Sequence, residues 1–235
     1  MGHPPPHTAQ LAGGRGGTTY RTPVAVPPAG GAPDPRTTAA MPRKTLAGGK
    51  GHTLLWSTVT NPQDRPVYAR REELAERMGQ EKSDWAISRS RNLLIYPNMF
   101  LMDQMGTQIR MFRPLSVDKT EVTIYCFAPV GEAPVERTKR IRQYEDFFNA
   151  SGMATSDDLT EFNETQKGCN NHSVIRWSDM SRGMAHELAG PDDLASGLGI
   201  TPASSGVKAS DEGIFVAQHQ RWAELMKTPS MGDKS

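Results

Sequence analysis

The chain contains little cysteine, and none of it forms a recognisable cluster or disulfide pattern. Its two cysteines, Cys126 and Cys169, lie far apart in the sequence. Neither stands in a CxxC or CxH arrangement, so the sequence predicts no zinc site, no iron–sulfur ligand set and no disulfide framework.

An excess of charge and long apolar runs are also missing. The formal net charge is +1, whereas a protein that binds nucleic acid is expected to carry a clear basic excess. No apolar run approaches the ~18 residues of a membrane span, and Met1–Gln10 lacks the hydrophobic core of an export signal. We therefore expect a soluble cytoplasmic protein with no nucleic-acid or membrane partner, which two lone thiols also fit.

Large apolar residues are almost absent from the first fifty or so residues, which are rich in Pro and Gly instead. Such a segment cannot bury enough surface to offset the entropy lost on ordering. We expect residues 1–51 to form a disordered tail, residues 52–228 to form the folded domain, and residues 229–235 to be disordered. An alternative for the tail is a basic, Pro-rich docking arm.

Strand patterns dominate the first half of the expected domain. His52–Val59 is short, apolar and β-branched enough for a strand, whereas Arg70–Met78 is a strong helix former. Between residues 93 and 127, Gln108–Arg113 and Glu121–Phe127 alternate polar and apolar residues. Three or four antiparallel strands joined by short turns fit this spacing.

Helix patterns dominate the second half. Pro134 suits the first turn of a long helix, which Gly152 is expected to end. Further helices are expected from about Thr155 to Lys167 and over Gln218–Lys227. The fold class predicted is α+β, an antiparallel sheet flanked by long helices. The apolar stripe of the first helix consists of Val135, Thr138, Ile141, Tyr144 and Phe148.

Residues that point to chemistry are few. Asp157 and Asp158 could supply a metal ligand or a base, but Thr155-x-x-Asp158 also resembles a capping box at a helix start. A mononuclear iron site for oxygen chemistry needs two histidines and one carboxylate on one face. His3 and His7 have ligand-like spacing but flank three prolines, and the other four histidines are isolated. Taken alone, these residues favour capping as the role of Asp158.

The most specific stretch of the sequence is Arg140–Leu159. Together with other segments it resembles the large subunits of benzoate, toluate and anthranilate dioxygenases, which are ring-hydroxylating dioxygenases of the Rieske type. The resemblance covers roughly Thr53 to Lys227. The other segments that carry it are Ser90–Gln104, Arg113–Cys126, Ser205–Lys208, Asp211–Val216 and Gln218–His219.

This resemblance implies a helix-grip type catalytic domain, in which an antiparallel sheet wraps a long helix over the substrate pocket. In the family, a Rieske [2Fe–2S] domain passes electrons to a mononuclear Fe(II) held by two His and one Asp. Both atoms of O₂ then add to the aromatic ring to give a cis-dihydrodiol. A separate NADH-dependent reductase supplies the electrons, and the large subunits form a trimer, usually with a small (beta) subunit attached. The expected substrate is a benzoate-type aromatic carboxylic acid.

The same resemblance assigns roles to individual residues. Asp158 matches the family's carboxylate iron ligand, which reverses the preference for capping, although one oxygen could cap while the other binds metal. Phe148, ten residues earlier, matches an aromatic residue that lines the pocket, while its place in the apolar stripe equally suits ordinary core packing. Asn98 and Met153 are expected to line the same substrate pocket.

Other ligands of the family are missing from the sequence. The Rieske ligands, a CxH and a CxxH pair, are absent, as is a D-x-x-H-x-x-x-x-H segment. We therefore expect an incomplete domain from a truncated or rearranged large subunit or a mis-started gene model. Loss of even an outer-shell partner costs ~10–100-fold in metal affinity, so one carboxylate should hold Fe(II) poorly. We therefore expect negligible turnover from this chain alone. The alternatives are a non-catalytic assembly subunit and a small aromatic-acid-binding helix-grip module.

Overall fold

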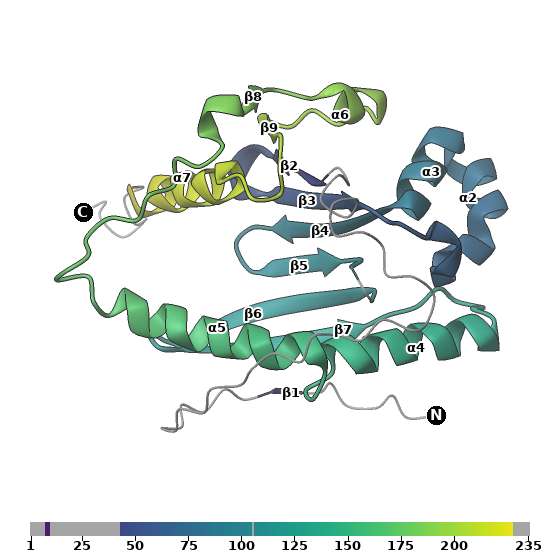
Figure 1. Ribbon diagram of the computed structural model, residues 1–235, viewed down its shortest axis with the longest axis horizontal. Helices are drawn as coiled ribbons and strands as arrows, with labels where there is room; N and C mark the ends of the chain where they lie inside the picture. Colours follow the sequence, from purple (N-terminus) through teal and green to yellow (C-terminus); the bar gives the residue numbers. More distant parts are fainter. Residues whose placement is uncertain (1–7, 10–42, 105, 228–235) are drawn as a thin grey trace, which may run out of the picture.

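A nine-stranded antiparallel sheet forms the centre of the molecule (Figure 1). The computed structural model describes residues 8–9, 43–104 and 106–227. The strand order is β1-β7-β6-β5-β4-β3-β2-β9-β8, so most neighbours in the sheet are also neighbours in the chain. The strands are β1 (Thr8–Ala9), β2 (Arg43–Ala47), β3 (Thr53–Thr58), β4 (Arg89–Ile95), β5 (Met99–Met102), β6 (Gln108–Ser116), β7 (Lys119–Cys126), β8 (Leu188–Ala189) and β9 (Ser204–Gly206).

Helices cover the sheet and its ends. In Figure 1, α4 and α5 run end to end along β6 and β7, while α7 lies beside β2 and β3. Pro134 stands at the first position of α4, as the sequence predicts. The helices are η1 (Gly49–Gly51), η2 (Pro62–Asp64), η3 (Pro66–Arg70), α2 (Arg71–Met78), α3 (Gln80–Ser88), α4 (Pro134–Phe148), α5 (Met153–Cys169), η4 (Met184–His186), α6 (Asp193–Gly197) and α7 (Gly213–Lys227).

The two faces of the sheet are distinguished by the period of two along each strand. On β6, Gln108 and Arg110 share one face, and the register places Phe100 of β5 and Ile124 of β7 directly opposite Arg110. Contacts from α4 and α5 reach this face at Arg110. On the other face, Trp56 of β3 packs edge-to-face against Trp85 of α3, with ring centroids 5.4 Å apart.

The folded part of the chain starts earlier than the sequence indicates. Residues 1–51 were expected to be a disordered tail, yet Arg43–Ala47 forms β2, an inner strand paired with both β3 and β9. Thr45 and Leu46 are buried there. A five-residue strand with one Leu offers little apolar signal by itself, and its order comes from the hydrogen bonds of two distant partners.

Glycine is required where the chain leaves β2. Gly51 has a φ of +81°, and a Cβ there would stand 2.9 Å from the ring of Tyr96 and 3.0 Å from the side chain of Arg221. This residue therefore brings η1 against α7 and the end of β4. Residues 1–7 and 10–42 of the expected tail, and the expected disordered C-terminus at residues 229–235, lie outside the described residues.

The predicted architecture is confirmed: an antiparallel sheet with long helices. The strands expected between residues 93 and 127 are β4 to β7. None of the helices in the described ranges is long and apolar enough to cross a bilayer.

Candidate functional site

Asp158 lies in the second turn of α5 and not at its start. The helix begins at Met153 after the N-cap residue Gly152, so no acidic residue occupies its first turn. The capping-box interpretation of Thr155 and Asp158 is therefore wrong. The hydroxyl of Thr155 instead donates to the carbonyl of Phe148, at 2.8 Å.

A close backbone approach sets where α5 begins. A Cβ on Gly152 would stand 2.7 Å from the carbonyl carbon and oxygen of Phe147 and 2.9 Å from the carbonyl oxygen of Asn149. Only glycine avoids this contact, which permits the tight connection from α4 to α5. Because the connection is short, the last residue of α4 and the second turn of α5 face the same part of the sheet.

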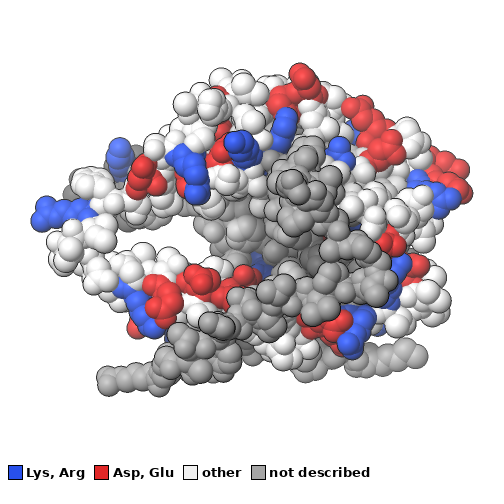
Figure 2. Space-filling model, in the orientation of Figure 1, with Lys and Arg blue, Asp and Glu red and all other residues white. Residues whose placement is uncertain are grey.

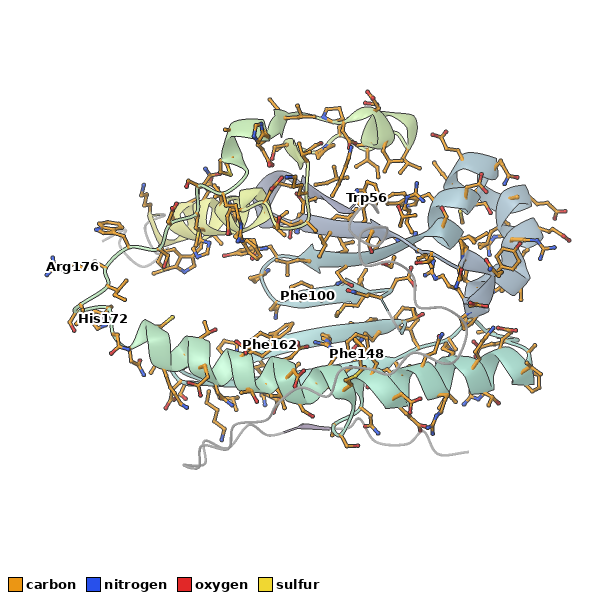
Figure 3. All side chains as sticks on the ribbon, in the orientation of Figure 1. Trp56, Phe100, Phe148, Phe162, His172 and Arg176 are labelled. Atoms are coloured by element: carbon orange, nitrogen blue, oxygen red, sulfur yellow. The ribbon has the colours of Figure 1, made fainter. Side chains whose placement is uncertain are left out.

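Arg110 of β6 joins these two helices to the sheet. Its Nη1 lies 3.7 Å from Oδ2 of Asp158, and its Cζ lies 4.8 Å from the ring centroid of Phe148. Phe148, labelled in Figure 3, is buried at the end of α4 and packs edge-to-face against Phe147. We call Gln108, Arg110, Phe148 and Asp158 the β6–α5 junction.

The junction combines a buried cation with a half-exposed anion. The side chain of Arg110 is 10% exposed and that of Asp158 is 45% exposed. Burial lowers the pKa of Arg110 from its ordinary value, an effect that the charge of Asp158 and the nearby Tyr144 oppose. An arginine remains protonated under such a shift, so the junction keeps a positive charge beneath the helices.

Two of the expected pocket residues lie nearer the surface. Asn98 stands in the turn between β4 and β5, exposed, and its Nδ2 donates to the carbonyl of Phe112 at 3.3 Å. Met153 is 63% exposed in the first turn of α5. The structure thus brings Asp158 and Phe148 together at Arg110 and leaves Asn98 and Met153 at exposed positions.

The described residues do not fit the iron site that the resemblance implies. Among them no group of three or more His, Cys, Asp or Glu side chains could hold a metal ion. The carboxylate of Asp158 pairs with Arg110. Two histidines form hydrogen bonds with the backbone: His52 Nδ1 accepts from Tyr96 N–H, and His219 Nδ1 bonds to the Phe215 carbonyl. His3 and His7 lie outside the described residues.

An iron–sulfur cluster does not fit the described residues either. Cys169 and His172 have the spacing of the CxxH half of the motif, so only the CxH half is missing from the sequence. Both are exposed at and beyond the end of α5, where His172 is labelled in Figure 3. The sequence contains no CxH motif to complete the set.

A separate cavity of about 1020 Å³ opens between η3, α2, the central strands and the segment after β7. Its size suits a small molecule, but its wall does not include Asp158 or Phe148. The arginines on that wall are paired with acidic neighbours: Arg70 with Glu73, Arg91 with Asp103, and Arg140 with Glu132. These pairs are satisfied without a ligand, so the β6–α5 junction is the stronger candidate site.

Charged side chains of both signs are interspersed on the side of the molecule shown in Figure 2. The same view shows an opening between α7 and the far end of α5. The segment that joins these regions carries exposed apolar residues, among them Trp177, which is 89% exposed.

The sequence does not single out Gln108 and Arg110 as site residues. The alternation of Gln108–Arg113 predicts the strand correctly, but it does not indicate which face of the strand is covered. In the structure these two polar residues face inward, with Gln108 fully buried and Arg110 nearly so.

Comparison with protein families matches residues 27–227 to the catalytic domain of the ring hydroxylating alpha subunit. The chain is 57% identical over 176 residues to the 2-halobenzoate 1,2-dioxygenase large subunit of Burkholderia cepacia, and 51% identical over 176 residues to the toluate 1,2-dioxygenase alpha subunit of Pseudomonas putida. It is 44% identical over 177 residues to the anthranilate 1,2-dioxygenase large subunit of Acinetobacter baylyi. These matches cover 75% of this chain and only 37–38% of the relatives.

Among solved structures, a naphthalene 1,2-dioxygenase from Rhodococcus sp. bound to indole superimposes with a TM-score of 0.67 and 18% identity. The match covers 85% of this chain and 48% of that one. A naphthalene 1,2-dioxygenase with indole in its active site gives a TM-score of 0.63 at 14% identity. At these identities, the likeness concerns the fold.

Proposed function

Because the chain belongs to the family of ring-hydroxylating alpha subunits, within their catalytic domain, we propose that it forms the substrate-holding part of an aromatic-acid dioxygenase large subunit. The observation that carries this proposal is its 44–57% identity to large subunits named for halobenzoate, toluate and anthranilate. Each of these compounds is a benzene ring bearing a carboxylate. A benzoate-type acid is therefore the proposed ligand of this chain.

The reaction proposed for the complete assembly is O₂- and NADH-dependent cis-dihydroxylation of the ring, an oxidoreductase step in aromatic catabolism. The assembly would include the small (beta) subunit, the NADH-dependent reductase and a trimer of large subunits, in the cytoplasm where NADH is supplied. In that assembly, Asp158 would be the carboxylate ligand of the iron, whose two histidine ligands the described residues do not supply, and a [2Fe–2S] cluster would supply electrons. Phe148, Asn98 and Met153 would border the substrate.

The chain by itself is proposed to bind the acid without turnover. Iron in this family requires two imidazoles in addition to the carboxylate, and the described residues offer no such group. This observation also favours the second candidate function, a non-catalytic subunit that binds an aromatic acid or assembles with dioxygenase subunits.

The test measures ligand and metal on the purified full chain. Benzoate and toluate are titrated by calorimetry, and iron is quantified after anaerobic incubation with Fe(II), in wild type and in Asp158→Ala. Benzoate binding with less than stoichiometric iron is expected. If neither benzoate nor toluate binds, the proposal is overturned. Stoichiometric iron in wild type that is lost in Asp158→Ala would refute the proposal that the chain binds the acid without iron, and it would favour a complete enzyme.

The second candidate is tested by mixing the chain with the small subunit and the reductase of a benzoate dioxygenase, with NADH and O₂. We expect no cis-diol by mass spectrometry. A co-eluting complex without product would favour the assembly role, and product formation would rule it out.

A further inference from the structure

Two nitrogen donors at the β6–α5 junction are buried and lack a partner. They are Nη2 of Arg110 and Nε2 of Gln108. Gln108 is fully buried and Arg110 is 8% exposed. A buried donor without an acceptor costs about 1–3 kcal/mol, and more when it is charged. Two such donors side by side therefore indicate a site that favours binding of a hydrogen-bond acceptor.

The geometry of the two side chains is fixed by their own contact. Nε of Arg110 donates to Oε1 of Gln108 at 3.0 Å. That bond holds the amide oxygen of Gln108 against the guanidinium, because the reverse orientation would set donor against donor. The amide nitrogen and the outer guanidinium nitrogen are thereby left free to bind another group.

The charge at the junction is only partly compensated. The counterion of Arg110 is Asp158, at 3.7 Å, beyond hydrogen-bond distance and on a half-exposed side chain. A half-exposed carboxylate at that distance is partly screened by solvent. The buried guanidinium can therefore accept a second, better-placed monoanion, and Asp158 marks the side on which the junction reaches solvent.

Two aromatic residues lie beside Arg110. Phe148 packs against the guanidinium of Arg110, and Phe100 lies directly opposite Arg110 on β5. Phe100 also packs edge-to-face against Phe112, with ring centroids 5.5 Å apart. A flat ring beside a carboxylate matches this combination of apolar faces and planar donors.

We propose that Arg110 and Gln108 bind the carboxylate of the aromatic acid and that Phe148 and Phe100 border its ring. Nη2 of Arg110 and Nε2 of Gln108 each donate one hydrogen bond to the carboxylate. This assignment rests on the proposed function and names the residues that select an acid over a neutral aromatic compound. Both are specificity-determining residues on the strand, separate from the helix residues that the resemblance identifies.

A purely structural role of Arg110 gives different expectations. Arg110 would then serve to hold α4 and α5 on the sheet through Phe148 and Asp158. Its replacement would lower stability, and the preference for acids over neutral compounds would not depend on Gln108. A variant that keeps Arg110 and changes Gln108 therefore separates the two roles.

The decisive variant is Gln108→Glu. It supplies a carboxylate inside the junction, so Arg110 gains an internal partner and the site repels an external anion. The probes are benzoate and its neutral analogue benzamide, titrated into the full chain by calorimetry, with thermal unfolding as the control for folding. The matched control is Arg113→Met on the same strand, since Arg113 lies on the other face, is exposed, and pairs with Glu121.

Wild type is expected to bind benzoate at least tenfold more tightly than benzamide. Gln108→Glu and Arg110→Met should weaken benzoate binding about 10–100-fold, the equivalent of one charge-assisted hydrogen bond. Gln108→Glu should keep or raise the unfolding temperature, and Arg113→Met should bind as wild type does. If Gln108→Glu does not fold, Gln108→Leu removes the same donor without adding a charge and should weaken benzoate binding likewise.

Benzoate affinities of Gln108→Glu (or Gln108→Leu) and Arg110→Met within twofold of wild type would overturn this assignment and leave the proposed function standing. Equal affinity of wild type for benzoate and benzamide would also overturn it. If the wild-type chain binds neither benzoate nor toluate, the assignment and the proposed function are overturned together.

Discussion

The hydroxyl of Thr155 donates a 2.8 Å hydrogen bond to the carbonyl of Phe148, which fixes the first turn of α5 to the last residue of α4. Both residues are buried. Through this bond the ring of Phe148 and the carboxylate of Asp158 are held on the same guanidinium, that of Arg110. The candidate site therefore depends on a contact between two helices that are consecutive in the chain.

Replacing Thr155 by Val should lower the free energy of unfolding by about 1–2 kcal/mol, because the buried carbonyl of Phe148 loses its donor. Urea unfolding of the full chain measures the effect. The matched control is Thr160→Val, since the hydroxyl of Thr160 donates to the carbonyl of Ser156 on the exposed side of the same helix. Equal effects of the two substitutions would contradict the structural role of Thr155.

Glycine at the start of α5 should not tolerate a side chain. Gly152→Ala places a Cβ 2.7 Å from the backbone of Phe147, and the shift that this forces should cost about 1–3 kcal/mol. Gly168→Ala in the last turns of the same helix meets nothing within 4 Å and should raise stability by up to about 1 kcal/mol. Denaturant unfolding of both variants provides the measurement. Stabilisation by Gly152→Ala would show that the α4–α5 connection is looser than described.

The ion pair of Glu132 and Arg140 should make stability depend on pH in the acid range. Both side chains are 8% exposed, and Arg140 Nε lies 2.9 Å from Glu132 Oε1. Hydrogen bonds from Arg140 lower the pKa of Glu132 from its ordinary value. The ion pair therefore stabilises the fold fully at pH values above the pKa of Glu132 in the unfolded chain, about 4.3. This stabilisation is lost as pH falls through the lower pKa that Glu132 has in the folded protein.

Glu132→Gln should remove that pH-dependent contribution and cost about 2 kcal/mol near neutral pH, because Arg140 keeps no charged partner at this position. The free energy of unfolding of both proteins is measured from pH 7 to pH 3. The two curves should converge as pH falls. Parallel curves over this range would mean that Glu132 titrates as an exposed carboxyl group does.

Asp158 and Arg110 should affect acid binding in opposite directions in the metal-free chain. Asp158→Asn removes the negative charge beside the guanidinium and should tighten benzoate binding about threefold, as expected for a half-exposed, screened charge. Its effect on stability should be small for the same reason. Calorimetric titration tests the prediction. Weaker benzoate binding by Asp158→Asn would contradict it, because the Asp158 carboxylate would then favour the bound acid.

Local patterns in the sequence were enough to predict the strands from residue 93 to residue 127 and the start of α4 at Pro134. Alternation and helix-start preferences act between residues a few positions apart, so the printed sequence carries them directly. The resemblance centred on Arg140–Leu159 gave the family and assigned Asp158 as its carboxylate iron ligand, whereas the local motif Thr155-x-x-Asp158 alone favoured capping.

Only the tertiary structure decided which positions face inward and which segments pair. Arg43–Ala47 reads as part of a Pro- and Gly-rich tail, and it becomes a strand because β3 and β9 supply its hydrogen bonds. Gln108 and Arg110 occupy polar positions of an alternating strand, yet both are buried, and the α4–α5 connection brings Phe148 and Asp158 onto Arg110. A period of two fixes that neighbouring side chains point apart, but the face that is covered depends on helices that follow later in the chain.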